Sequence, residues 1–136
     1  MMEESTQTIS LQTMENQKHP TYGNGKICYI EIPADNIDLS AKFYQLVFGW
    51  QTRISNDGFT SFDDGVGEVS GTWVTGRKAA SEAGLVISIM VSDIYQTIEL
   101  ISANGGKVIR KFNPESSEKV AWVTDPFGNI LGLYQH

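Results

Sequence analysis

Glu31 is the side chain of this sequence with the most evident capacity for chemistry, because it is a carboxylate within the apolar run Ile27–Ile32. Tyr29 lies two residues earlier and therefore shares one face of a strand with it. A carboxylate on an inward strand face is costly unless it is paired. Its partner is either a cationic centre of a ligand or a structural donor such as Lys26, Arg53 or a backbone amide. Together with Tyr29 it also permits acid–base chemistry in an apolar pocket, although nothing else in the sequence indicates a reaction.

The other reactive side chains form no recognisable catalytic arrangement. His19 lies in a polar N-terminal segment and His136 is the last residue, so both are expected to be solvated. Cys28 has neither a histidine close to it in the sequence nor a second cysteine, and we expect it to be a small buried hydrophobic residue. The Gly-x-Ser-x-Gly, phosphate-binding and Cys-x-x-Cys motifs are absent. We therefore assign no catalytic residue.

The composition indicates one globular domain with an acidic surface. The chain has 136 residues, of which 40% are hydrophobic and 19% charged, and its formal net charge is −6. Such a chain, without a basic stripe, is a poor binder of nucleic acid or of an anionic membrane, and it favours a neutral or cationic ligand. A single cysteine is typical of a reducing compartment. No apolar run approaches the ~18 residues of a membrane span and no signal peptide is visible, so we expect a cytoplasmic protein.

Two stretches of the sequence show the same order of expected elements. Residues 1–22 are polar and predict a flexible N-terminal tail, or an arm that orders on a partner subunit, and the folded domain is expected at 23–136. Asn36 and Asp93 are typical helix N-caps, and each precedes an apolar stripe at helical spacing. Strands are expected at about 27–32, 50–54, 59–63 and 67–74, and again at about 85–91, 107–112, 119–124 and 129–134.

These two stretches are predicted to be copies of one β-α-β-β-β unit. A shift of 57 residues places Asn36 on Asp93. A shift of 61 residues places Gly67–Trp73 on Gly128–Tyr134, and both segments read Gly-x-(Val/Ile)-x-Gly-x-aromatic. One helix and about four strands cannot bury both of their faces alone, so the two units, or two chains, must pack together. The two modules are expected at about 25–74 and 84–136.

Two motifs connect the sequence to a known family. The first helix ends in Phe-Tyr-x-x-Val-Phe-Gly-Trp at Phe43–Trp50, and Asp125–Asn129 form an Asp-Pro-x-Gly-Asn turn. With the internal repeat, they resemble the vicinal oxygen chelate superfamily, which includes glyoxalases, bleomycin resistance proteins and dihydroxybiphenyl-dioxygenase-like domains, over about residues 25–136. The resemblance implies an α+β fold in which two tandem β-α-β-β-β modules form a half-open barrel. It also implies a homodimer.

Catalytic members of this superfamily hold a divalent metal ion on four side chains, each of them His, Glu or Gln. The resemblance places these four positions on Tyr29, Gly71, Val86 and Gly132. Valine and glycine have no side-chain donor, and a neutral tyrosine is a poor ligand for such ions. We therefore expect no metal ion and no other cofactor.

Strand alternation predicts which side chains share the cavity face with those four positions. The face is expected to be apolar and aromatic with one acid, and Gly71 and Gly132 leave room on it for a flat group. Trp122 is expected in the core, and Arg110 and Lys111 at a solvated sheet edge. Aromatic residues on the cavity face either stack on a ligand or simply fill the barrel. The expected ligand-binding residues are Tyr29, Glu31, Trp73, Ser88, Met90 and Tyr134.

The function that these expectations favour is metal-independent binding of a small aromatic or cationic organic molecule. The bleomycin resistance branch of the superfamily similarly lacks the metal ion and binds bulky, basic aromatic drugs, usually between subunits. One alternative is a superfamily enzyme, namely a lyase, an isomerase or a dioxygenase of unknown substrate. Another is an interaction module that uses the fold only to dimerise or to bind another protein.

Overall fold

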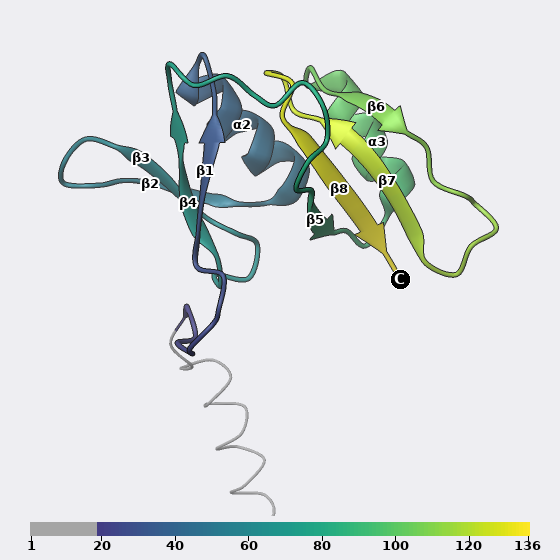
Figure 1. Ribbon diagram of the computed structural model, residues 1–136, viewed down its shortest axis with the longest axis horizontal. Helices are drawn as coiled ribbons and strands as arrows, with labels where there is room; N and C mark the ends of the chain where they lie inside the picture. The colour runs from purple at the N-terminus through teal and green to yellow at the C-terminus, as the bar shows by residue number, and fades with distance from the viewer. Residues whose placement is uncertain (1–18) are drawn as a thin grey trace, which may run out of the picture.

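The computed structural model describes residues 19–136, which form two successive modules of the same order (Figure 1). Residues 1–18 of the predicted tail lie outside the described residues. The first module contains β1 (Tyr29–Pro33), α2 (Ile37–Phe48), β2 (Gln51–Ile54), β3 (Thr60–Asp63) and β4 (Ser70–Val74). The second contains β5 (Ile87–Met90), α3 (Ile94–Ala103), β6 (Lys107–Arg110), β7 (Lys119–Thr124) and β8 (Ile130–Gln135).

Each module builds one four-stranded sheet, and the two sheets have the same topology. Sheet A has the strand order β1-β4-β3-β2 and sheet B the order β5-β8-β7-β6. The pairs β1–β4 and β5–β8 are parallel, whereas the other pairs are antiparallel. The sheets do not close into one barrel (Figure 1). The predicted α+β fold of two tandem modules in a half-open arrangement is therefore confirmed.

The helices begin where the sequence predicts them. The side chain of Asn36 accepts a hydrogen bond from the amide of Leu39 at 3.0 Å, and Asp93 accepts one from the amide of Gln96 at 3.1 Å. Both are N-cap contacts that satisfy free amides of the first turn. Gly49 ends α2 with a φ of 70°, a left-handed conformation that glycine adopts without strain.

Each helix covers one face of its sheet, and the opposite face is called the open face below. Behind sheet A lie four packed aromatic rings: the ring of Trp50 is 4.7 Å from that of Tyr44 and 4.6 Å from that of Phe62, which is 4.9 Å from Trp73. All four residues are buried. Behind sheet B the core consists mainly of aliphatic residues, among them Ile94, Ile101, Ala121, Val123 and Leu133.

A buried carboxylate joins the two modules. Asp125, which is 1% exposed, accepts a hydrogen bond from the hydroxyl of Tyr44 on α2 at 2.8 Å. It also accepts from the amides of Phe127 and Asn129 at 2.9 and 3.0 Å, and the Asn129 side chain donates to both Asp125 and the Pro33 carbonyl. Burial, followed by the Asp125 charge, raises the pKa of Tyr44 well above its usual value. The β7–β8 turn of the second module is thereby fixed to α2 and β1 of the first.

A second carboxylate holds the segment that precedes β1. Glu68, in the β3–β4 connection, accepts hydrogen bonds from the Thr21 amide and hydroxyl at 3.0 and 2.9 Å. His19 Nδ1 lies 2.6 Å from the same carboxylate, and Lys26 Nζ lies 3.6 Å from it. Residues 19–22, which the sequence predicts to belong to a flexible tail, therefore contact the folded domain through Glu68.

Replacing Glu68 by glutamine is expected to remove part of the pH dependence of stability. The Thr21 hydrogen bonds and His19 lower the pKa of Glu68 from 4.5 to about 2. Because the folded pKa is depressed, this carboxylate stabilises the fold fully above pH 4.5 and progressively less as the pH falls toward 2. Urea unfolding at several pH values should show that the difference between wild type and Glu68→Gln shrinks over that window. Glu99→Gln, an exposed change on α3, should give no such trend, and a difference independent of pH would contradict the role of Glu68.

Candidate functional site

The register of sheet A corrects one part of the predicted cavity. Tyr29 pairs with Ser70 and Ile30 with Gly71, so Tyr29, Glu31 and Ser70 share the open face. Gly71 and Trp73 point toward the helices instead, and Trp73 is only 2% exposed. The prediction that Gly71 and Trp73 line the cavity is therefore wrong by one residue. The physical reason is the Phe62 ring, whose Cζ would lie 2.2 Å from a Cβ at position 71, so glycine is needed there for packing behind the sheet.

The open face of sheet A carries charges that are already paired. Arg53 Nε and Nη2 each lie 3.1 Å from a carboxylate oxygen of Asp63, which also accepts a hydrogen bond from the Ser70 hydroxyl at 2.7 Å. The Arg53 hydrogen bond lowers the pKa of Asp63. Glu31 accepts from Arg77 at 2.7 Å, a residue of the linker between the modules. The structural partner of Glu31 is thus neither Lys26 nor Arg53, the two side chains suggested by the sequence.

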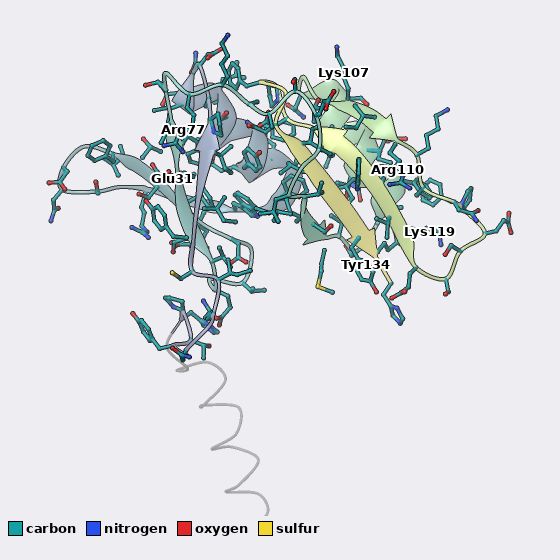
Figure 2. The ribbon with its side chains drawn as sticks, in the orientation of Figure 1. Glu31, Arg77, Lys107, Arg110, Lys119 and Tyr134 are labelled. Carbon is teal, nitrogen blue, oxygen red and sulfur yellow. The ribbon has the colours of Figure 1, made fainter. Side chains whose placement is uncertain are left out.

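The open face of sheet B is built from three rows of side chains that cross the strands. Its middle row runs from Arg110 on β6 through Trp122 on β7 and Gly132 on β8 to Ser88 on β5. Figure 2 shows Arg110, Lys107 and Tyr134 on this module, Glu31 on the first module and Arg77 on the linker between the modules. The two flanking rows are Val120, Tyr134 and Met90 on one side, and Lys107, Thr124 and Ile130 on the other.

Trp122 and Arg110 are residues of this face that the sequence interpretation missed. The neighbours Ala121 and Val123 are fully buried against the helix, so alternation turns Trp122 to the open face, where it is partly exposed. The prediction that Trp122 belongs to the core is wrong. Arg110 is not simply a solvated edge residue, because its guanidinium carbon lies 4.9 Å from the centre of the Trp122 ring. The alternation of side chains along a strand could have placed Trp122 on the face opposite Ala121 and Val123. The sequence alone does not say which face is buried, because β7 has apolar residues on both of its faces.

Gly132 makes room for the Ser88 side chain beside Trp122. A Cβ at position 132 would lie 2.3 Å from the Ser88 hydroxyl oxygen, so the serine side chain uses space that any larger residue at 132 would need. Tyr134 stands in the next row, and its hydroxyl donates to Glu118, which raises the pKa of Tyr134. Met90 is 78% exposed beside it. The small residues Gly132 and Ser88 therefore form a low floor between aromatic and apolar side chains.

Within one chain the predicted site residues do not meet in a single pocket. Glu31 and Arg77 line a cavity of about 290 Å³ between β1, the linker and β8. Ser88 and Met90 line another, of about 300 Å³, between β5 and the first module. Tyr29 and Tyr134 line neither of these cavities. Cys28, which the sequence predicts to be buried, is exposed because it precedes the paired part of β1.

The residues at the superfamily's four metal positions do not fit a metal ion. On β4 it is Ser70, and not Gly71, that lies on the open face. The four residues at the metal positions are therefore Tyr29, Ser70, Val86 and Gly132. No carboxylate, imidazole or thiolate is among them, although these are the ligands that hold such ions. Within residues 19–136, no group of three or more His, Cys, Asp or Glu side chains is arranged to hold a metal ion. We therefore derive no chemical step through a metal.

Comparison with known proteins identifies the family. The profile described as the Glyoxalase/Bleomycin resistance protein/Dioxygenase superfamily matches residues 26–133, and the chain belongs to this superfamily. A probable lactoylglutathione lyase of Vibrio parahaemolyticus is 31% identical over 127 aligned residues, which cover 83% of this chain and 92% of that protein. A lactoylglutathione lyase of Haemophilus influenzae is 30% identical over 117 residues and covers 76% of this chain and 87% of its own length.

Solved structures support the same fold. A fosfomycin resistance protein from Listeria monocytogenes superimposes with a TM-score of 0.69 over 84% of this chain and 93% of that chain, at 13% sequence identity. At that identity the likeness defines the fold alone. None of the helices formed by residues 19–136 has the length and apolar character needed to cross a membrane.

Proposed function

We propose that this chain is a metal-independent binding protein for a small aromatic organic molecule, which lies on the open face of sheet B. The observation that carries the proposal is the arrangement of Trp122, Tyr134 and Met90 around the small residues Gly132 and Ser88. A flat ring placed over a glycine can stack against neighbouring aromatic side chains while it loses contact with water. Such a site needs no metal ion, in agreement with the donor set described above.

The binding cavity is proposed to form between two copies of the chain. Each sheet has one face that its own helix leaves uncovered, and Tyr29, Met90 and Val120 on these faces are 52%, 78% and 47% exposed. Met90 and Val120 lie side by side with Tyr134 on the open face of sheet B, and exposed apolar side chains grouped in this way are typical of an interaction surface. Sheet A of one copy placed over sheet B of the other would cover both faces and enclose a ligand, which supports the predicted homodimer. The dimer should have about twice the 15.0 kDa mass of the chain in solution.

A cationic ligand is the weaker part of the sequence prediction. Its basis is Glu31, and that carboxylate is already paired with Arg77 at 2.7 Å. A ligand cation would have to displace this guanidinium. The aromatic part of the prediction does not depend on Glu31. The cytoplasmic location stays a prediction, based on the single cysteine and on the lack of a visible signal peptide or membrane-spanning run in the sequence.

The second candidate is a superfamily enzyme, which the identity to lactoylglutathione lyases favours. Against it stands the absence of metal donors at Tyr29, Ser70, Val86 and Gly132. The two candidates differ in their need for a metal ion. Purified protein is expected to retain no stoichiometric Zn, Ni, Mn or Fe, and to gain no lactoylglutathione lyase activity when these ions are added. Activity that follows metal loading would establish the enzyme instead.

Ligand-induced stabilisation tests the binding proposal. A panel of aromatic compounds is screened by thermal unfolding without added metal, and at least one is expected to raise the melting temperature by several degrees. A ligand at 100 times its dissociation constant stabilises the folded state by about 2.7 kcal/mol. Trp122→Ala should lose the shift, whereas Leu46→Ala, an exposed change on α2, should keep it. If no compound stabilises the protein, or if Trp122→Ala responds as the wild type does, the site is not on this face.

A further inference from the structure

The charges on the two open faces are not balanced in the same way. On sheet A, Arg53 is paired with Asp63, and Glu31 is paired with Arg77. On sheet B, the guanidinium of Arg110 has no carboxylate within 4.0 Å among residues 19–136. The open face proposed to hold the ligand therefore presents a cation that no carboxylate of residues 19–136 neutralises.

The position of Arg110 suits recognition of a planar anion. Its guanidinium lies over the Trp122 ring, 4.9 Å from the ring centre, and a guanidinium that stacks in this way keeps N–H groups along its edge. Those N–H groups match the two oxygens of a carboxylate. Gly132 follows Trp122 in the same row, and Ser88 ends it. A ring over Gly132 and Ser88 would thus lie next to Trp122, and a substituent on it would reach the Arg110 cation across the Trp122 ring.

We propose that the ligand of this face is a planar aromatic carboxylate, with its ring over Gly132 and its carboxylate on Arg110. This inference rests on the proposed function, and it names the charge of the ligand that the sequence interpretation left as neutral or cationic. The formal net charge of the chain is −6, so an anion is not attracted by the protein as a whole and needs a local cation such as Arg110.

A carboxylate of a second copy is the competing occupant of Arg110. In the proposed dimer, sheet A of the partner faces sheet B, and sheet A carries two carboxylates, Glu31 and Asp63. Each of them is already paired within its own chain, with Arg77 and Arg53 respectively. A free ligand carboxylate has no such partner to give up. These pairs favour the ligand as the anion, and the oligomeric state of an Arg110 variant distinguishes the two.

The test uses three probes that share one ring system and differ in charge: 2-naphthoate, 2-naphthamide and 2-naphthylmethylamine. Calorimetric titration of the full-length protein at low salt is expected to show that naphthoate binds at least about tenfold more tightly than the other two, because hydrogen bonds to charged groups are the stronger ones. Arg110→Gln should abolish this preference, so that naphthoate binds no more tightly than the amide. Lys111→Gln removes the same charge from the next residue and should keep the preference. Higher ionic strength should reduce the preference.

The outcomes separate this inference from the proposed function. Equal binding of the three probes would overturn the carboxylate assignment but leave aromatic binding intact. Tighter binding of the amine would also overturn it and would point back to Glu31. Failure of all three probes to bind would overturn the carboxylate assignment, and the wider screen of aromatic compounds would then decide the proposed function separately. If Arg110→Gln dissociates the dimer and no charge preference exists in the wild type, Arg110 is a subunit contact and the inference fails.

Discussion

Replacing Asp125 by alanine is expected to lower the free energy of unfolding by about 3–4 kcal/mol, since it leaves buried donors without their acceptor. The Tyr44 hydroxyl and the Phe127 amide both lose a hydrogen bond of 2.8–2.9 Å. Urea unfolding followed by circular dichroism measures the effect. Asp93→Ala removes the same side chain from an exposed helix N-cap and should cost only about 1 kcal/mol. Equal losses in the two variants would show that the Asp125 network does not hold the modules together.

The connection between the modules can be measured directly with a second residue. Tyr44→Phe removes one donor to Asp125 from α2, in the other module. If the hydrogen bond stabilises the junction, the cost of Tyr44→Phe should largely disappear in the Asp125→Ala background, because contacting residues are not additive. Additive losses would mean that each residue stabilises only its own module.

The fold could be predicted from the sequence because its signals are local and occur twice. Asn36 and Asp93 cap the helices by contacts three residues away, and the alternating strands repeat at a nearly constant spacing. The turn from Asp125 to Asn129 is likewise closed by its own side chains. Local rules of this kind depend little on the rest of the chain. The sequence did not indicate that Asp125 also accepts a hydrogen bond from Tyr44, since that contact joins residues 81 positions apart.

The site could be predicted only in part because it depends on strand register. Strand alternation predicts correctly that Tyr134, Ser88 and Met90 share one face of sheet B, because β5 and β8 pair without a register shift. The prediction that Trp122 lies in the core fails because β7 has apolar side chains on both faces, and aromatic residues are found in both environments. The sequence does not indicate Arg77 as the partner of Glu31, because no periodic pattern places a linker residue beside a strand.

The prediction that Gly71 lines the cavity is wrong because Gly71 and Gly132 share a sequence motif but pack on different faces of their sheets. The motif Gly-x-(Val/Ile)-x-Gly-x-aromatic aligns Gly71 with Gly132, yet Gly71 faces the helices and Gly132 faces the open side. In a strand, a shift of one residue moves every side chain to the other face. The two glycines therefore meet different needs: one leaves room for the Phe62 ring, and the other leaves room for the Ser88 side chain.

Replacing Gly71 by alanine should therefore mainly lower the stability of the fold, whereas replacing Gly132 by alanine should mainly abolish ligand binding. Gly71→Ala is expected to destabilise the protein by about 3 kcal/mol, because its Cβ would lie 2.1 Å from the Ile30 carbonyl oxygen and 2.2 Å from Phe62 Cζ, neither of which can move freely. Gly132→Ala meets the Ser88 hydroxyl, which can rotate, so the expected loss is about 1 kcal/mol. Chemical denaturation gives both values. Gly132→Ala should nevertheless abolish ligand binding, because its methyl group fills the floor of the proposed site.

The Gly71→Ala and Gly132→Ala variants together test which face of sheet A Gly71 occupies: the helix side, as the observed strand pairing gives, or the cavity side, as the motif suggests. If Gly71 lined the cavity, as the motif suggested, its alanine variant would be about as stable as that of Gly132 and would lose ligand binding. The observed ladder predicts instead that Gly71→Ala, studied below its lowered melting temperature, binds the ligand with unchanged affinity. A serine-to-alanine change at Ser88 should restore the stability of Gly132→Ala, since it removes the oxygen 2.3 Å from the new Cβ, and should have no effect on Gly71→Ala. Rescue of Gly71→Ala by that change would contradict the register.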